Sequence, residues 1–425
     1  MTVTAGADIG IDLNAEAFWE QSPEERNAAF ARLRREAPIA FFEEPELPFF
    51  PKGPGYYAVT KHADVEYMSA TPELFCSGQG ATSIVDLPME MQEFYGSMIS
   101  MDNPRHAKIR RIVSTAFTPK MLEALIDDVD TLSREIIADA RKVAEANNGE
   151  FDLVREVAAP LPLRVICRMM GIPEADEAMV LEQSNIILSG GDPDFIATPE
   201  EGMGMVLNAG QMLSDLMLRL GEERRTTPTD DLTSALIHAE IDGESLTDQE
   251  IASFFILLCV AGNETTRTAT SHGVYELDRR PEQRKAWIAD ESLTKTAVEE
   301  IVRYASPVGW MRRTATQPVT IRGQEFPEGS KFILFYGSAN RDEEVFSDPD
   351  TFDITRTPNP HVGFGARGPH FCLGANLARR ELAIAFRNLF ELMPDLQVVG
   401  EPDRLRSSFI NGIKRMTVKI PVSPA

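Results

Sequence analysis

Near its C-terminus the sequence reads Phe364-Gly365-Ala366-Arg367-Gly368-Pro369-His370-Phe371-Cys372-Leu373-Gly374. A glycine-rich loop here delivers one cysteine to the start of a predicted helix, because residues 375–383 hold helix-forming side chains at helical spacing. The free N–H groups and the positive dipole end at a helix N-terminus stabilise a thiolate. The position of Cys372 therefore favours an ionised sulfur, the form that binds a metal.

The residues around Cys372 distinguish a metal-bound thiolate from an ordinary buried cysteine, which is common at loop–helix junctions. Gly374 has no Cβ, so its backbone can lie close to a flat porphyrin, and Gly365 permits a tight loop. The arrangement favours a cysteine bound to haem iron, a ligand that promotes cleavage of the O–O bond. The loop resembles the haem-binding loop of the cytochromes P450. This resemblance implies haem b with Cys372 as its axial iron ligand, and it makes Phe364, Gly365 and Gly374 haem-binding residues of the loop.

Composition and charge limit the possible partners. The chain has 425 residues, of which 43% are hydrophobic and 25% charged, as in a soluble globular protein. It lacks a membrane-spanning apolar run and the basic-then-apolar order of a signal peptide. The formal net charge of −24 disfavours nucleic acid and anionic membranes as partners. We expect a cytoplasmic protein without a transmembrane anchor. The other cysteines are scattered, which argues against a zinc site and a disulfide framework.

The resemblance implies a mainly α fold with a small β-rich region, which is the cytochrome P450 fold. We find no internal repeat or long linker, and expect one P450 domain over residues 1–425. Strands are predicted within residues 38–60, 307–335 and 396–420, and helices within 61–305 and 374–392.

A second motif follows the apolar run 254–260 and reads Ala261-Gly262-Asn263-Glu264-Thr265-Thr266. Glycine inside a helix costs about 1 kcal/mol relative to alanine, and small residues leave room beside a flat cofactor. The Thr265 hydroxyl can compete for the Ala261 carbonyl and open the helix locally. Glu264 and Thr265 then match the acid–alcohol pair that delivers protons in the P450 central helix. The alternative is an ordinary buried helix that ends in a polar turn.

Further matches concern the scaffold. Glu300 and Arg303 are one helical turn apart and can pair. In the family such a pair is completed by an arginine after a Phe-x-x-Pro-x-x-Phe segment, which is 346–352 here, followed by Arg356. The resemblance gives these three residues structural work. A surface salt bridge would explain the Glu300–Arg303 spacing equally well.

The two haem propionates also need partners. His106 and Arg110 are four residues apart on one helical face, and Arg313 and His370 match the remaining propionate contacts of the family. Arginine suits a carboxylate because its donors form a planar fork. Each of these residues, taken alone, could be a surface charge.

The loop length points to a branch of the family. Phe364 lies eight residues before Cys372, one more than is usual among relatives. The longer loop resembles that of the actinobacterial P450s that oxidise sterols and methyl-branched lipids. Segments 94–99, 161–163, 169–173, 251–258 and 338–343 are similar to those of the mycobacterial-type methyl-branched lipid omega-hydroxylases. Ala366 stands where these usually have a second glycine, and it would be strained if φ were positive there.

Equivalent segments predict a mostly apolar substrate pocket, although an ordinary core explains the same residues. The candidate pocket residues are Phe94, Met98, Leu258, Ala261, Val308, Trp310, Phe409 and Ile410.

The resemblance implies a monooxygenase that uses O2 and hydroxylates the terminal (omega) carbon of a methyl-branched fatty acid, an isoprenoid or a sterol side chain. Electrons would come from NAD(P)H through ferredoxin reductase and ferredoxin, and Lys108, Arg111 and Arg379 are expected to be exposed where an acidic ferredoxin docks near Cys372. The alternative substrate is a polyketide or other secondary metabolite. A peroxide-using enzyme or dehydratase usually lacks the acid–alcohol pair. A haem-based sensor would need an output domain, and we identify none.

Overall fold

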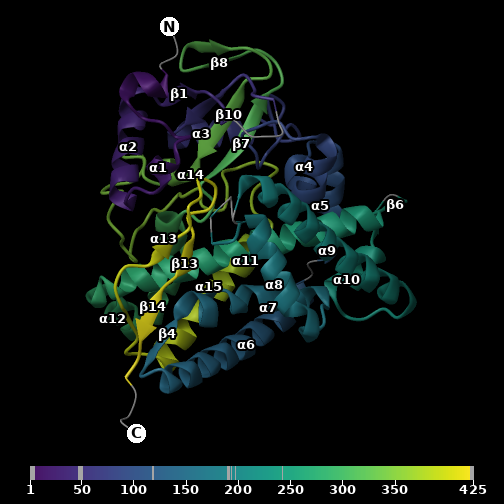
Figure 1. Cartoon of the computed structure of the whole chain (residues 1–425), viewed down its shortest axis with the longest axis vertical. Helices are drawn as coiled ribbons and strands as arrows, with labels where there is room; N and C mark the ends of the chain where they lie inside the picture. Colours follow the sequence, from purple (N-terminus) through teal and green to yellow (C-terminus); the bar gives the residue numbers. More distant parts are fainter. Residues whose placement is uncertain are drawn as a thin grey trace.

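The chain folds into a larger helical part and a smaller part built around a five-stranded sheet (Figure 1). The computed structural model describes residues 5–45, 51–116, 119–188, 192, 194–196, 198–241 and 243–421. Residues 46–50, within the segment 38–60 in which strands are predicted, lie outside the described residues. In the part of the chain that is described, no helix combines the length and the apolar character needed to cross a bilayer.

The helical part is organised around α11 (Asp248–Asp278), which crosses it in Figure 1. Thr247 caps the start of the helix: its hydroxyl accepts from the Glu250 N–H while the Glu250 carboxylate accepts from the Thr247 N–H. Most side chains from Ile251 to Leu277 are buried. An apolar helix surrounded by other helices is expected to be buried on all sides. α7 (Pro160–Met170), α9 (Pro199–Thr226) and α15 (Ala375–Leu392) pack against it, and α6 (Pro119–Ala146) packs against α15.

The remaining helices are α1 (Glu16–Trp19), α2 (Pro23–Glu36), α3 (His62–Ala70), α4 (Met89–Gly96), α5 (Arg105–Ala116), α8 (Glu174–Leu188), α10 (Leu232–Ile237), α12 (Pro281–Ala289), α13 (Thr294–Ala305) and α14 (Tyr336–Ala339). Short 3-10 helices cover Gly6–Ile9, Ser97–Ser100 and Glu291–Leu293, and a π-helical turn covers Val154–Ala158.

The main sheet has the strand order β1-β2-β10-β7-β3. β1 (Ile39–Phe42) pairs antiparallel with β2 (Tyr56–Val59), and β2 pairs in parallel with β10 (Lys331–Phe335), with Ile333 opposite Ala58. β10 then pairs antiparallel with β7 (Trp310–Ala315), which also pairs with β3 (Phe75–Cys76). Every residue of β10 is buried, as expected for a central strand covered on both faces.

The smaller strands form separate ladders. The three-stranded sheet has the order β11 (Gln397–Val398), β14 (Thr417–Lys419), β4 (Glu150–Asp152), and the two-stranded pairs are β5 (Glu240–Ile241) with β6 (Glu244–Ser245), β8 (Val319–Ile321) with β9 (Gln324–Phe326), and β12 (Asp403–Arg404) with β13 (Ile413–Arg415). Most strands fall in the predicted ranges. β3, β4 and the β5–β6 pair lie instead within 61–305, where only helices were predicted. β3 and β4 pair with strands far away in the sequence, so no local pattern marks them.

A buried ion network ties α13 to the loop that follows the main sheet. Both side chains of the Glu300–Arg303 pair are fully buried, with Arg303 Nε 2.7 Å from Glu300 Oε2. Arg356 Nε donates to Glu300 Oε1 at 3.2 Å, and the Asp353 N–H donates to the same carboxylate at 2.8 Å. The structure therefore brings together the three residues to which the sequence gives structural work.

Arg303 also fixes the loop backbone. Its guanidinium donates to the carbonyl oxygens of Asn340, Pro349 and Thr351. A buried charge whose partner is removed is strongly destabilising, because its desolvation is no longer compensated.

We therefore expect Glu300→Gln to lower the free energy of unfolding by about 3 kcal/mol or more, measured by urea unfolding followed by circular dichroism. The matched control is Glu36→Gln, which breaks a surface ion pair with Arg32. The Arg32 side chain is 46% exposed and the Glu36 side chain 44%. That variant should lose less than about 1 kcal/mol. Equal losses in the two variants would contradict a structural role for Glu300.

Candidate active site

A cavity lies between α11 and the loop that carries Cys372, and most of its lining is apolar. It is closed on other sides by residues of α7, β7 and α15. The lining residues that the sequence proposes are Met98, Arg110, Leu258, Ala261, Gly262, Thr265, Val308, Arg313, Phe364, Gly365, His370, Cys372 and Gly374.

The cysteine loop is closed by its own backbone. The Cys372 N–H donates to the Phe364 carbonyl at 3.0 Å, and Gly365 has a φ of +80°. Gly368 has a φ of +140°, and a Cβ there would lie 2.1 Å from the Ser69 carbonyl oxygen, so only glycine fits. Ala366 is buried and does not adopt a positive φ, so the strain considered for an alanine at this position does not arise.

The Cys372 side chain opens onto this cavity just before α15. Burial among protein atoms raises the pKa of the Cys372 thiol, while the N–H groups of Gly374 and Ala375 and the charges of Arg110 and Arg379 act in the opposite direction. A metal cation deprotonates a thiol that coordinates it outright. The site is therefore built for a sulfur that becomes ionised when it binds a cation.

Three of the four basic side chains predicted to bind the propionates, Arg110, Arg313 and His370, line the same cavity, and His106 lies behind them against His370. The rings of His106 and His370 are 4.2 Å apart, and Arg110 and Arg313 reach the cavity from α5 and β7. Burial is the largest cause that lowers the pKa of both histidines, and the charges of Arg110 and Arg313 lower it further. Among the described residues, none of the four forms an ion pair with an acidic side chain, and Nε2 of His106 is buried without a hydrogen-bond partner. The cluster therefore lacks an anion, and the two carboxylates of a haem fit this need.

On α11, the Thr265 hydroxyl donates to the Ala261 carbonyl at 2.7 Å, as predicted. The helix nevertheless runs unbroken through this position, so the predicted local opening is absent. Gly262 has a second reason to lack a side chain, because a Cβ would lie 2.9 Å from Cδ1 of Ile166 on α7. Its small size serves helix packing as well as the cavity.

Glu264 does not line the cavity. It is 1% exposed and pairs with Arg267 one turn later, and Arg267 also donates to Asn185 at 2.9 Å. Burial raises the pKa of the Glu264 carboxyl, and Arg267 opposes that shift. The acid and the alcohol are thus neighbours in sequence that face different sides of α11.

Four residues proposed for the pocket are not brought to this cavity. Strand alternation explains Trp310, because Met311 and Arg313 of β7 line the cavity and the alternate residues, Trp310 and Arg312, point to the opposite face. Trp310 packs instead on Phe409, with ring centroids 4.9 Å apart. Ile410 belongs to a separate apolar cluster that also contacts Phe409.

Phe94 is the fourth proposed pocket residue that does not line the cavity. Its ring packs edge-to-face on that of Tyr95, with the ring centroids 5.0 Å apart. The prediction missed other lining residues. Ile166 and Met169 stand one turn apart on α7, a helical spacing that the sequence does contain. Glu381 lines the cavity too, and burial raises the pKa of its carboxyl to about 8. No local pattern marks Glu381, because its burial depends on α11 and α15 coming together.

Comparison with known proteins decides the family. The cytochrome P450 family model matches residues 77–290 and 286–394. The chain belongs to the cytochrome P450 family. This P450 is 50% identical over 410 residues to a methyl-branched lipid omega-hydroxylase of Mycobacterium tuberculosis (strain CDC 1551 / Oshkosh), covering 96% of this chain and 94% of that protein. It is 37% identical over 410 residues to a steroid C26-monooxygenase of Mycolicibacterium smegmatis, covering 96% of this chain and 92% of that protein.

The fold comparison agrees with this membership. A solved Mycobacterium marinum cytochrome P450 in complex with pseudoionone superimposes with a TM-score of 0.91 at 40% identity, covering 97% of this P450 and 98% of that chain. The mainly α fold predicted from the sequence is thus confirmed. This P450 is an enzyme of the monooxygenase class, and membership implies a haem-iron cofactor. The cavity residues fit that group: Cys372 would hold the iron, and the basic cluster would hold the propionates.

Because Cys372 is the sulfur that opens onto the cavity, Cys372→Ser should lose the thiolate-type absorption of the reduced carbon monoxide complex, or lose haem altogether. The control is Cys76→Ser, at a buried cysteine of β3 that does not line the cavity. That variant should keep the thiolate-type spectrum. A Cys372 variant that also keeps it would refute the ligand assignment.

Proposed function

We propose that this P450 is a cytoplasmic hydroxylase of the terminal carbon of methyl-branched lipids, isoprenoids or sterol side chains. One oxygen atom of O2 enters the terminal C–H bond, and the other leaves as water. The electrons come from NAD(P)H through ferredoxin reductase and ferredoxin. Haem, when bound, supplies the activation of O2. The observation that carries the proposal is the apolar cavity that ends at Cys372 and Thr265.

The strength of the terminal C–H bond and the apolar surface of the cavity support terminal hydroxylation. A terminal methyl C–H bond is stronger than its internal neighbours, so the cavity must select the position by holding the chain end-on. Leu258, Val308 and Met311 offer apolar surface for such an end. Each buried methyl contributes roughly 0.8 kcal/mol, which corresponds to a few-fold preference for a branched end over a linear one. The names of the relatives and the pseudoionone complex of the structural neighbour point to the same substrate class.

Product analysis tests the substrate directly. A branched fatty acid of the phytanic type and a linear acid of equal chain length should both shift the haem spectrum, and the branched one should bind a few-fold more tightly. Its main product should carry the hydroxyl on a terminal carbon, identified by mass spectrometry. Oxidation mainly at internal carbons, or no spectral shift with any branched lipid, would overturn the omega assignment and leave the monooxygenase class untouched.

Protons reach the reaction through α11 in this proposal. Thr265 is anchored on the Ala261 carbonyl and lines the cavity. Glu264 lies on the buried side of the same turn, and its raised pKa keeps a proton available closer to neutral pH than an ordinary carboxyl does. Arg267 limits that rise by pairing with Glu264. Because the two groups face different sides, a side-chain rotation or a water must link them.

Thr265→Ala should leave haem and substrate binding intact and divert reducing equivalents away from product, because the cavity loses its hydroxyl. The measurement is product formed per NAD(P)H consumed, together with hydrogen peroxide released. Ser271→Ala is a matched control. The Ser271 hydroxyl likewise donates to the carbonyl four residues earlier, that of Arg267, at 2.8 Å, but Ser271 does not line the cavity. Coupling that falls equally in both variants, or in neither, would remove Thr265 from proton delivery.

The redox partner would dock near the cysteine loop. Lys108 and Arg111 are exposed, as predicted, whereas Arg379 is half-buried. Lys108 is 2.7 Å from Glu244, and Arg379 pairs with Glu299 while its guanidinium lies 4.3 Å from the Phe364 ring. Arg111 also makes an interaction of its own. The exposed Arg367 and Arg380, in contrast, form no ion pair with any described residue. We therefore propose these two arginines as contacts for an acidic ferredoxin.

Arg367→Gln combined with Arg380→Gln should slow electron transfer from ferredoxin roughly tenfold at low salt and flatten its dependence on ionic strength. Stopped-flow reduction of the substrate-bound enzyme measures both. Lys285→Gln, an exposed lysine of α12, serves as the control for a simple change in net charge. If the double variant and Lys285→Gln behave alike, the docking surface lies elsewhere.

A further inference from the structure

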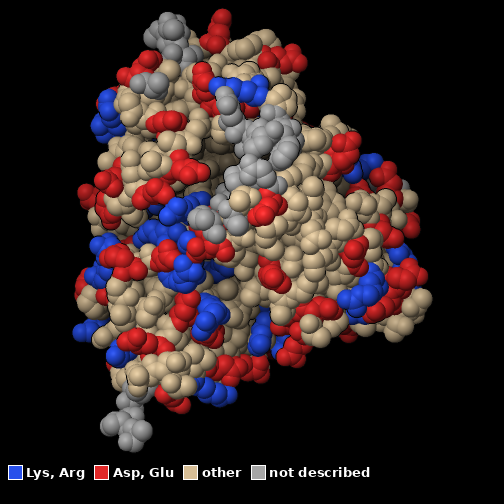
Figure 2. Space-filling model, viewed as in Figure 1, with Lys and Arg blue, Asp and Glu red and all other residues tan. Residues whose placement is uncertain are grey.

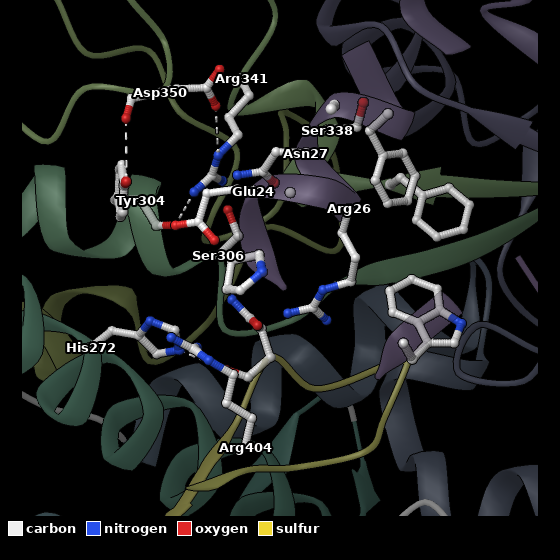
Figure 3. A pocket seen from close by; sticks show the side chains of 18 of the residues that line it. Glu24, Arg26, Asn27, His272, Tyr304, Ser306, Ser338, Arg341, Asp350 and Arg404 are labelled. Carbon is white, nitrogen blue, oxygen red and sulfur yellow. Dashed lines mark hydrogen bonds and ion pairs between the residues drawn. The ribbon is translucent and has the colours of Figure 1, made fainter. Parts of the chain in front are cut away.

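A second cavity, of about 430 Å³, lies behind one wall of the first. It is lined by residues of α2, the end of α11, the start of α14 and the segment 404–411, and it is open to the surface (Figure 3). The segment 306–309 forms the wall between the two cavities, and its residues face one or the other. Pro307 and Val308 line the cavity at Cys372, while Ser306 and Gly309 line the second one. The second cavity shares no lining residue with the first and has no role in the chemistry described above.

The lining of this cavity is basic. It contains Arg26, Arg279, Arg280, Arg341 and Arg404, against only Glu24, Glu276 and Asp350. The whole chain has the opposite balance, with 66 acidic and 42 basic residues. In Figure 2, Lys and Arg side chains also gather on the surface over the neighbouring strand β13. A local excess of positive charge in a chain of net charge −24 needs a cause.

Internal partners account for only some of these arginines. Arg280 pairs with Glu276, and Arg341 lies 3.4 Å from Asp350. Arg26 and Arg404 form no ion pair and no side-chain hydrogen bond with any residue that the structure describes, and Nε of Arg26 is buried without a partner. The two guanidiniums come from α2 and β12 and point into the same space, where Arg26 lies 6.0 Å from the Trp19 ring and Arg404 lies 5.7 Å from the Tyr275 ring but neither has an acidic partner among the described residues (Figure 3).

The unpaired charges act on one another and on a neighbouring histidine. Burial, together with the charges of Arg404 and Arg341, lowers the pKa of Arg26 to about 10. Burial and the same positive charges lower the pKa of His272 to about 3, so this histidine is neutral at physiological pH and offers no charge of its own. Like charges held together in a partly buried space are unfavourable, and an anion between them would remove that cost.

The rest of the lining suggests what is attached to the anion. Trp19, Phe30 and Phe335 provide apolar surface, and Asn27 and Asn411 provide neutral polar groups. A cavity of this size accepts a small organic molecule rather than a bare ion alone. We propose that this cavity binds a small organic oxyanion, whose carboxylate or phosphate contacts Arg26 and Arg404 and whose apolar body lies against Trp19 and Phe30.

Calorimetric titration of the haem-loaded full chain tests the proposal, with the first cavity blocked by an azole inhibitor. The probes are phenyl phosphate and phenylacetate, which share an aromatic ring and differ in the oxyanion, and benzyl alcohol as the neutral counterpart. We expect saturable binding of one equivalent of at least one oxyanion, and none of the alcohol. Tighter binding of phenyl phosphate assigns a phosphate ligand, and tighter binding of phenylacetate assigns a carboxylate.

Arg26→Gln and Arg404→Gln should each weaken that binding at least tenfold. Arg32→Gln, on the same helix but paired with Glu36 on the surface, should leave it unchanged. Saturable binding of no oxyanion, equal binding of benzyl alcohol, or affinities unaffected by the Arg26 and Arg404 substitutions would overturn the proposal.

A second measurement separates a binding role from a structural one. In anion-free buffer, Arg26→Gln should melt at the same temperature as the wild type or higher, because one repelling charge is gone. Adding the bound probe should raise the melting temperature of the wild type and not that of the variant. If Arg26→Gln melts lower in anion-free buffer, Arg26 is structural and the proposal fails.

Discussion

The hydrogen bond from the Cys372 N–H to the Phe364 carbonyl closes the loop on which the rest of the site depends. It holds the sulfur just before the N-terminus of α15, and α15 packs against α11. The contact between these two helices therefore sets the position of Thr265 relative to Cys372. The basic cluster comes from three parts of the chain: His106 and Arg110 lie on α5, Arg313 on β7 and His370 on the cysteine loop. The cavity thus has rigid helices on two sides and charged donors on a third, which suits a large flat ligand with an anionic edge.

A continuous set of hydrogen bonds connects the buried Glu300–Arg303 pair to that loop. Arg303, held by Glu300, donates to the Asn340 carbonyl at 2.8 Å. The Asn340 side-chain oxygen accepts from the Val362 N–H at 2.7 Å, and the Gly365 N–H donates to the Val362 carbonyl at 2.9 Å. Damage to the buried ion network should therefore reach the sulfur through the backbone, although no member of the network lines the cavity. Structural and functional residues are separate in this protein, but they are mechanically connected.

The fold and the central site were predictable because their signals are local. The cysteine loop, the small residues at Ala261 and Gly262, and the Glu300–Arg303 spacing all lie within short segments, and such segments carry the family resemblance. The side of an element that each side chain occupies was harder to predict. Trp310 points away from the cavity because β7 alternates, and Glu264 pairs with Arg267 because Thr265 already occupies the cavity face of α11. The second cavity had no sequence signal, since Arg26, His272 and Arg404 converge only after folding.

The order of strands in the main sheet also has a consequence for the newly made chain. β1 and β2 lie near the N-terminus and pair with each other, but the other edge of β2 pairs with β10, and within the described part of the chain β3 pairs with β7 alone. Until β10 leaves the ribosome, one edge of β2 has no native partner, and β3 likewise waits for β7; unpaired edges are prone to aggregation. The backbone hydrogen bonds inside the helices between residues 62 and 305 are local, so these helices can form first. Completion of the sheet is therefore a late step, and a chain stalled before β10 would be a natural substrate for chaperones.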